Sequence, residues 1–250
     1  MKTLKGQKAV VTGGSRGLGL GIVEALIAQQ ADVTVVARDP ERLAQVSRQL
    51  GVKVISGDIT NKELARMILR DVQPSILVLN AGATPVMGAL HDLSWDDFNR
   101  VWETDVKAGF HWLQEAIRLP LPPGSRVIVG SSGAALDGSP LSGSYAGAKR
   151  MLWLMAGYAN GVARGLGLGI HFQAIVPMQI IGETELGRIA AEAYAQLKGV
   201  GVEALLAGFG ASMPPHMVGD NVVSILTDPR YEKGVAFGMK GELGIVSLDS

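Results

Sequence analysis

Short apolar runs alternate with helical stretches along almost the whole chain. Six runs are nearly continuous in apolar and β-branched residues, at Ala9–Thr12, Val33–Ala37, Val52–Ser56, Ile76–Leu79, Arg126–Val129 and Ile170–Val176. Unbroken apolar strands are typical of a sheet that is covered on both faces. Alternation of strands with helices implies right-handed crossovers between parallel strands. The pattern therefore predicts an α/β fold with one doubly wound parallel sheet and helices on both faces.

Residues typical of helix starts stand where several helices of this pattern would begin. Asp39 is a capping residue followed by a first-turn proline, Thr60 with Glu63 fits a capping box, and Ser94 precedes another helical stretch. These signals predict helices that start close to residues 40, 61 and 95.

The segment 178–215 departs from the alternation because it is helix-like and rich in alanine and glycine throughout. A late helical insertion beyond the carboxyl end of a strand is where a substrate lid would lie. No internal repeat or linker interrupts the chain. We therefore expect a single domain over residues 1–250, with a helical substrate lid at about 178–215.

Composition excludes several kinds of site and partner. The 23 basic and 23 acidic residues give a formal net charge of zero, which argues against nucleic acid or an anionic membrane as the main partner. There is no cysteine, so disulfides and cysteine-ligated zinc are excluded, and the four histidines lack metal-ligand spacing. His171, Gln173 and Gln179 interrupt the longest apolar stretch. We expect a cytoplasmic protein without a metal site, a nucleic-acid partner or a membrane span.

The sequence VVTGGSRGLGLGI, residues 10–22, runs from the first predicted strand directly into a helix. Gly13, Gly17 and Gly19 allow a tight turn, and they let backbone N–H groups and the helix N-terminus approach a pyrophosphate. A glycine-rich turn without a ligand would leave this spacing unexplained. The segment therefore predicts a dinucleotide site in a Rossmann-type fold.

Tyr145 and Lys149 lie four residues apart in SYAGAK, with only small residues between them. Residues at this spacing share one face of a helix. Ser132 stands just after the fifth predicted strand, and Asn80-Ala81-Gly82 follows the fourth. Together with G-x-x-x-G-x-G, these residues resemble the short-chain dehydrogenase/reductase family over nearly the whole chain. The resemblance implies a nicotinamide-dependent oxidoreductase acting on a small carbonyl or alcohol substrate.

The resemblance also implies roles for individual residues. Tyr145 would be the general acid or base, Lys149 would supply positive charge and bind the nicotinamide ribose, and Ser132 would donate to the substrate oxygen. A free phenol titrates at about pH 10, so the lysine would bring its ionisation toward neutrality. Asp58 would meet the adenine. The implied cofactor-binding residues are Gly13, Ser15, Arg16, Gly17, Leu18, Gly19, Arg38, Asp58, Ile59, Asn80, Ala81, Gly82, Tyr145, Lys149, Pro177 and Ile180.

The end of the second strand indicates which nicotinamide is bound. Ala37 stands where family members that prefer NAD usually carry an acidic residue for the ribose 2′-hydroxyl. Arg38 follows it, and Arg16 lies inside the glycine turn. Two guanidinium groups beside the adenosine ribose suit a 2′-phosphate. The sequence therefore predicts NADP(H) as the cofactor.

Two residues depart from the family pattern. Asp105 stands where members usually have an asparagine, whose main-chain carbonyl holds a water that passes protons to the lysine. That main-chain role survives the change, and we count Asp105 with the catalytic residues, but an extra carboxylate near Lys149 would offset its charge. Met178 replaces the glycine that usually follows the proline of the sixth strand, which puts a bulky side chain near the nicotinamide end.

These departures motivate a rival interpretation, a catalytically impaired NADP(H)-binding sensor or scaffold. The presence of Ser132, Tyr145 and Lys149 together argues against it, since a sensor needs none of them. A nucleotide-binding domain with unrelated chemistry would leave the serine–tyrosine spacing unexplained. By the same resemblance, the helix that carries Trp153 and Met155 would lie in a homodimer or homotetramer interface.

Overall fold

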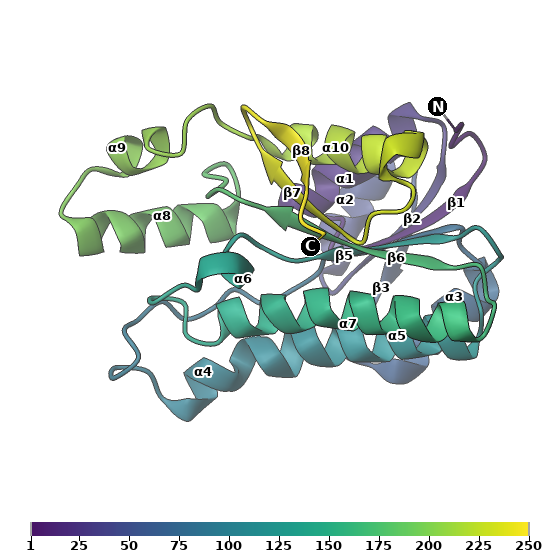
Figure 1. Ribbon diagram of the computed structural model, residues 1–250, viewed down its shortest axis with the longest axis horizontal. Coiled ribbons are helices and arrows are strands. Elements are labelled where there is room, and N and C mark those ends of the chain that lie inside the picture. The colour runs from purple at the N-terminus through teal and green to yellow at the C-terminus, as the bar shows by residue number, and fades with distance from the viewer. Residues whose placement is uncertain (1, 250) are drawn as a thin grey trace.

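In the computed structural model, which describes residues 2–249, eight strands form one sheet in the order β3-β2-β1-β4-β5-β6-β7-β8 (Figure 1). All neighbours are parallel except β7 and β8. The strands are β1 (Lys8–Thr12), β2 (Asp32–Ala37), β3 (Lys53–Ser56), β4 (Ile76–Leu79), β5 (Arg126–Gly130), β6 (His171–Pro177), β7 (Ala236–Lys240) and β8 (Gly244–Ser247). The predicted doubly wound sheet is confirmed, and all six predicted strands are present within one or two residues of their expected bounds.

Two helical layers cover the sheet, and Figure 1 shows them on its opposite faces. On one face, α1 (Gly17–Ala28), α2 (Pro40–Leu50) and α10 (Pro215–Thr227) bury one apolar core, with Ile22, Leu43 and Val222 at its centre. On the other, α3 (Lys62–Val72), α5 (Lys107–Arg118) and α7 (Tyr145–Gly165) bury a second core around Trp112 and Leu152.

The remaining helices lie at the carboxyl ends of the parallel strands or next to them. α4 (Trp95–Val101) runs through the π-helical turn η1 (Trp102–Val106) into α5, and the short α6 (Ala134–Asp137) follows β5. The lid holds α8 (Glu185–Lys198) and α9 (Val202–Ala207), which extend beyond the sheet at the left of Figure 1. A 3₁₀ turn, η2 (Pro229–Tyr231), leads to β7.

Capping agrees with the sequence at two helices and differs at one. Asp39 accepts from the N–H groups of Glu41 and Arg42, and Ser94 forms a capping box with Asp97. The capping box expected at Thr60 is wrong. Asn61 caps α3 instead, because the N–H of Thr60 already donates to the carboxylate of Asp58 at 2.9 Å.

Candidate active site

The glycine turn between β1 and α1 packs against the loop that follows β4. Gly13 has φ +69°, and a Cβ placed on it would lie 2.7 Å from Cα of Ala81. A Cβ on Gly19 would lie 2.2 Å from the carbonyl oxygen of Gly13. The hydroxyl of Thr12 accepts from the N–H groups of Asn80 and Ala81 at 3.1 and 3.2 Å. The two loops therefore form one rigid wall in which only glycine fits at positions 13 and 19.

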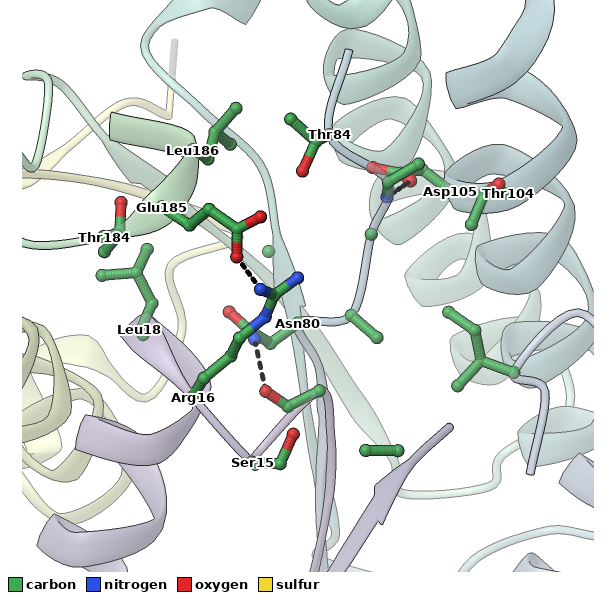
Figure 2. A pocket seen from close by; sticks show the side chains of 18 of the residues that line it. Ser15, Arg16, Leu18, Asn80, Thr84, Thr104, Asp105, Thr184, Glu185 and Leu186 are labelled. Atoms are coloured by element: carbon green, nitrogen blue, oxygen red, sulfur yellow. Dashed lines mark hydrogen bonds and ion pairs between the residues drawn. The ribbon is translucent and has the colours of Figure 1, made fainter. Parts of the chain in front are cut away.

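A cleft of about 720 Å³ opens at this wall, at the carboxyl ends of the central strands (Figure 2). Its lining includes most of the residues expected to hold the cofactor: Gly13, Ser15, Arg16, Gly17, Leu18, Arg38, Asp58, Ile59, Asn80, Ala81, Gly82, Tyr145 and Lys149. Three expected residues do not line it. Gly19 packs beneath the turn, whereas Pro177 and Ile180 line a second, adjoining cavity. The cleft runs past the N-terminus of α1, as a dinucleotide site requires.

Three arginines gather at one end of the cleft. Arg16, Arg38 and Arg42 all line it. Partial burial lowers the pKa of Arg16, and the positive charges of Arg42 and Arg38 lower it further. The three guanidinium groups therefore add their positive charge to one region of the cleft, which favours an anion there. Arg42, in the first turn of α2, was not predicted, and its position directly behind the Asp39 cap is the signal that could have found it.

Arg16 also reaches across the cleft to the lid. Its Nη1 forms an ion pair with Oε2 of Glu185, in the first turn of α8, which Figure 2 shows as a dashed line. Thr184 caps the same helix by accepting from the N–H of Gly187 at 2.9 Å. The lid thus begins at the edge of the cleft, and one of the three arginines is shared between the cleft and the lid.

Tyr145 and Lys149 share one face of the first turn of α7, as their spacing predicts. Nζ of Lys149 lies 5.6 Å from the centroid of the Tyr145 ring. The carbonyl oxygen of Lys149 accepts from the hydroxyl of Ser131 at 2.9 Å, which ties α7 to the end of β5. Ser132 comes next, and its oxygen accepts from the N–H of Ala134 at 3.3 Å. Tyr145 lines both cavities, whereas Ser132 lines only the second.

Asp105 contacts Lys149 directly through its side chain. From the sequence we expect only a carboxylate somewhere near Lys149. Oδ2 of Asp105 lies 2.9 Å from Nζ of Lys149, and the two residues are 1% and 6% exposed. Oδ1 accepts from the N–H of Ala83 at 2.7 Å. A Cβ on Gly82 would lie 2.5 Å from Oδ2, so the loop after β4 needs a glycine there. Asp105 therefore ties this loop to the lysine through both carboxylate oxygens.

The Asp105–Lys149 ion pair determines the charge of the lysine. Burial by itself lowers the pKa of Lys149, but the charges of Asp105 and Tyr145 and the hydrogen bond to Asp105 outweigh it, so the pKa is raised. Lys149 is consequently protonated at neutral pH. A π-helical turn, which holds Asp105, widens the backbone and is often found at functional positions.

The second cavity, of about 570 Å³, lies between the loop after β5, the end of β6 and the lid. Met178, the second departure from the family pattern, is among its lining residues. A Cβ on Gly238 of β7 would lie 2.5 Å from the sulfur of Met178, so a glycine accommodates this side chain. Across the cavity, the hydroxyl of Tyr194 in α8 is hydrogen-bonded to that of Ser139. Sequence reasoning did not single out Tyr194.

Comparisons with known proteins identify the family. The family model described as short chain dehydrogenase matches residues 7–191, which is more than half of the chain. The chain belongs to the short-chain dehydrogenase family. The resemblance seen in the sequence is thereby confirmed, and it places this protein among oxidoreductases.

Several curated relatives of this short-chain dehydrogenase carry names. The "Cyclic-di-GMP-binding biofilm dispersal mediator protein" of Escherichia coli (strain K12) is 30% identical over 71% of this chain and 74% of its own length. The "NADPH-dependent pterin aldehyde reductase" of Arabidopsis thaliana is 29% identical over 67% and 72%. The "Uncharacterized oxidoreductase YghA" of Escherichia coli (strain K12) is 29% identical over 70% of this chain, and the match spans 62% of its length.

Solved structures extend the likeness over nearly the whole dehydrogenase. A "blue fluorescent protein from metagenomic library in complex with NADPH" matches at a TM-score of 0.75 and 26% identity, covering 96% of this chain and 98% of its own. A single-residue variant of "Actinorhodin Polyketide Ketoreductase with NADPH" matches at a TM-score of 0.82 and 23% identity, covering 98% and 99%. The second likeness supports the fold alone. Both of these structures contain NADPH.

Two kinds of feature are not found in the part of the dehydrogenase that the structure describes. Within residues 2–249, no three histidine, cysteine, aspartate or glutamate side chains are grouped so that they could hold a metal ion. No described helix is both long and apolar enough to span a membrane.

Proposed function

We propose that this short-chain dehydrogenase is an NADP(H)-dependent oxidoreductase that interconverts a carbonyl compound and its alcohol, with Tyr145 as general acid and base. The observation that carries the proposal is the position of Tyr145, which lines both cavities beside a protonated lysine. One cavity has the features of a dinucleotide site, and the other adjoins it at the tyrosine. A substrate in the second cavity would therefore meet the cofactor next to Tyr145.

The residues of the cleft fit the cofactor. The close-packed glycine turn and the N-terminus of α1 suit a pyrophosphate, and Asn80 with its neighbours continues the same wall of the cleft. Arg16, Arg38 and Arg42 suit a 2′-phosphate, which guanidinium groups bind through charge and paired hydrogen bonds. When bound, the nicotinamide would exchange a hydride with the substrate carbon. The preference for NADP(H) over NAD(H) rests on this arginine cluster.

Proton transfer would be carried out by residues of this chain. Ser132 would donate a hydrogen bond to the substrate oxygen, and Tyr145 would give that oxygen a proton during reduction and remove it during oxidation. The ammonium group of Lys149 would stabilise the phenolate form through space. Asp105 would act as a positioning residue, since it holds Lys149 in place and is itself held by the N–H of Ala83.

The interpretation as a sensor remains the alternative, and one experiment separates the two. The purified protein is mixed with NADPH and a panel of ketones, aldehydes and quinones, and oxidation of NADPH is followed with Tyr145→Phe as the control. We expect turnover of at least one compound and its loss in the variant. NADPH binding without turnover of any compound would contradict the proposal and favour the sensor.

Three further expectations accompany the proposal. We expect one domain over residues 1–250, a cytoplasmic location and a homodimer or homotetramer. We expect its ligands to be small molecules, with no nucleic acid or membrane as a partner. Light scattering of the purified protein measures the oligomeric state, and a monomeric mass would contradict that expectation.

A further inference from the structure

The second cavity carries information on the substrate, because its shape and its polar groups are both defined by the structure. It has a volume of about 570 Å³, which lies within the range of about 300–1,000 Å³ found for small-molecule sites. Its walls come from the loop after β5, the segment after β6 and the lid helices α8 and α9. Such a space is far larger than a single ketone group requires.

Most of the side chains on these walls are apolar. Among them are Leu136, Met178, Ile180, Leu186, Leu205 and Phe209. Asp137 and Lys198 are the only charged residues that line the cavity, and both are exposed to solvent. Because both charged groups stay hydrated, the interior surface of the cavity carries no buried charge. This surface favours a ligand body that is itself apolar.

The polar side chains near the catalytic helix are already bonded within the protein. The hydroxyls of Ser139 and Tyr194 are paired with each other. The hydroxyl of Ser131 donates to the carbonyl of Lys149 at 2.9 Å, and that of Ser142 donates to the carbonyl of Ser139 at 3.5 Å. Each of these side chains therefore already has a hydrogen-bond partner within the protein.

The same holds for the polar side chains contributed by the lid and by the segment leading to it. The amide of Gln179 donates to the carbonyl of Ala211 at 3.0 Å and accepts from the N–H of Gly241 at 2.9 Å. The hydroxyl of Thr184 donates to the carbonyl of Ile181 and caps α8. These groups serve the fold of the lid.

Two hydroxyl groups that line the cavity have no partner among the side chains and carbonyls of the described part of the protein. Ser132 accepts from the N–H of Ala134, which leaves its own hydrogen free to donate. Tyr145 has no hydrogen bond to its hydroxyl among residues 2–249. The hydroxyls without a partner are therefore those of the proposed reaction, and together they suit one oxygen atom.

We infer that the substrate is a bulky, apolar ketone or the corresponding secondary alcohol, with its single oxygen on Ser132 and Tyr145 and its hydrocarbon body in the second cavity. The inference rests on the proposed function and specifies its substrate class. Each methylene buried against the apolar wall strengthens binding about fourfold. Additional hydroxyls on the substrate would lose their water and meet few side-chain partners in this largely apolar lining, so we expect sugars and polyols to be poor substrates.

Three ketones of graded size and polarity test the inference. They are cyclohexanone, 4-cyclohexylcyclohexanone and 4-(tetrahydropyran-4-yl)cyclohexanone, and kcat/KM is measured for each with NADPH. We expect the second ring of 4-cyclohexylcyclohexanone to raise kcat/KM at least about 30-fold over that of cyclohexanone. This is well below the increase that complete burial of six carbons would give. The ring oxygen of 4-(tetrahydropyran-4-yl)cyclohexanone should lower kcat/KM at least about fivefold relative to 4-cyclohexylcyclohexanone. Equal or better turnover of cyclohexanone would overturn the inference and leave the proposed function standing.

A variant of the cavity wall tests whether the hydrocarbon body of the substrate binds in the second cavity. Leu136→Asp puts a carboxylate on the cavity wall at a position that is 39% exposed, so the fold tolerates it. Leu166→Asp makes the same change at a position that is 63% exposed and does not line the cavity. Only Leu136→Asp should reduce the ratio of kcat/KM for 4-cyclohexylcyclohexanone to that for cyclohexanone, by at least about fivefold. An unchanged ratio would overturn the inference.

A binding measurement without turnover separates the inferred substrate class from the proposed oxidoreductase function. Calorimetry with 4-cyclohexylcyclohexanone is carried out on the NADPH complex of Tyr145→Phe, which cannot supply the proton. Binding is expected there, and it should weaken in the double variant with Leu136→Asp. If the unmodified protein turns over no ketone while this binding is present, the proposed function fails and the assigned ligand class stands. Absence of both binding and turnover would overturn both.

Discussion

Replacing Asp105 by asparagine tests the electrostatic part of the proposed mechanism. The carboxylate forms an ion pair with the ammonium of Lys149 through one oxygen and accepts from the N–H of Ala83 through the other. An asparagine has only one acceptor oxygen, so it cannot serve both donors. If its oxygen stays on Ala83, the side-chain NH₂ faces Lys149 and the ammonium loses its counter-charge. As long as Lys149 stays protonated, the net charge next to Tyr145 then rises by one.

The size of the effect follows from the geometry. A unit charge on Nζ of Lys149, 5.6 Å from the centroid of the Tyr145 ring, interacts with a phenolate by about 3 kcal/mol at an effective dielectric constant of about 20. That energy corresponds to about two pH units. In the unmodified protein, Asp105 cancels part of this interaction. We therefore expect Asp105→Asn to move the pH dependence of the reaction toward lower pH.

The assay is the pH dependence of kcat/KM for oxidation of an alcohol with NADP, in which the phenolate is the base. In the unmodified protein activity should require alkaline pH, and the rising limb for Asp105→Asn should lie about one unit lower, with NADP binding nearly unchanged. Glu103→Gln is the matched control, because Glu103 lies in the same π-helical turn with its side chain 65% exposed. Superimposed profiles for Asp105→Asn and the unmodified protein would refute the electrostatic argument.

Three other predictions concern stability, cofactor choice and the lid. Since the pKa of Lys149 is raised in the folded protein, its contribution to stability is present below the unfolded lysine value of about 10.4 and is lost as pH rises through the folded value. Asp105→Asn should accordingly lower the free energy of unfolding at pH 7 by about 3–5 kcal/mol, and a change within error in urea denaturation would contradict this. The unmodified protein should bind NADPH more tightly than NADH, and Arg38→Asp should reverse much of that preference in titrations, because a carboxylate repels a 2′-phosphate; equal affinities in the unmodified protein would refute the assignment. Amide hydrogens of residues 180–213 should exchange faster than those of the parallel strands and slow when cofactor and substrate are both present; apo protection equal to that of the sheet would refute a mobile lid.

The sequence predicted the parallel part of the sheet because buried parallel strands are unbroken apolar runs. It did not predict β7 and β8. β7 has the sequence AFGMK, in which a glycine interrupts a short run, and β8 has only four residues and pairs antiparallel to it. Such short segments carry too few residues for a period to be recognised. The cap of α3 was misplaced by one residue, because Thr60 and Asn61 are both capping types and only a contact with Asp58 decides between them.

The candidate site was predictable where its geometry is local. Tyr145 and Lys149 meet because four residues on a helix bring them to one face, and the glycine turn is continuous in sequence. The direct contact between the side chains of Asp105 and Lys149 joins two helices, and it depends on a π-helical turn that no sequence signal indicates. The contact of Tyr194 with Ser139 likewise depends on how the lid folds back.

The sequence of the lid is rich in glycine and shows no obvious helix cap, yet its longer helix is capped at both ends. Thr184 caps α8, and the helix ends at Gly199 with φ 65°. The cap is hard to recognise from the sequence because its partner Gly187 lies inside a segment rich in glycine. α9, in contrast, has no side-chain cap. Mobility of the lid therefore remains a prediction that rests mainly on α9 and the glycines around it.

Transfer of an isotopic label tests the central claim most directly. NADPH carrying deuterium at C4 of the nicotinamide, in each of its two stereoisomers, is incubated with the unmodified protein and 4-cyclohexylcyclohexanone, and the product is analysed by mass spectrometry. The account predicts that one stereoisomer delivers deuterium to the carbinol carbon, and that Tyr145→Phe abolishes the product while still binding NADPH. An unlabelled alcohol from both stereoisomers, or a Tyr145→Phe variant as active as the unmodified protein, would contradict it.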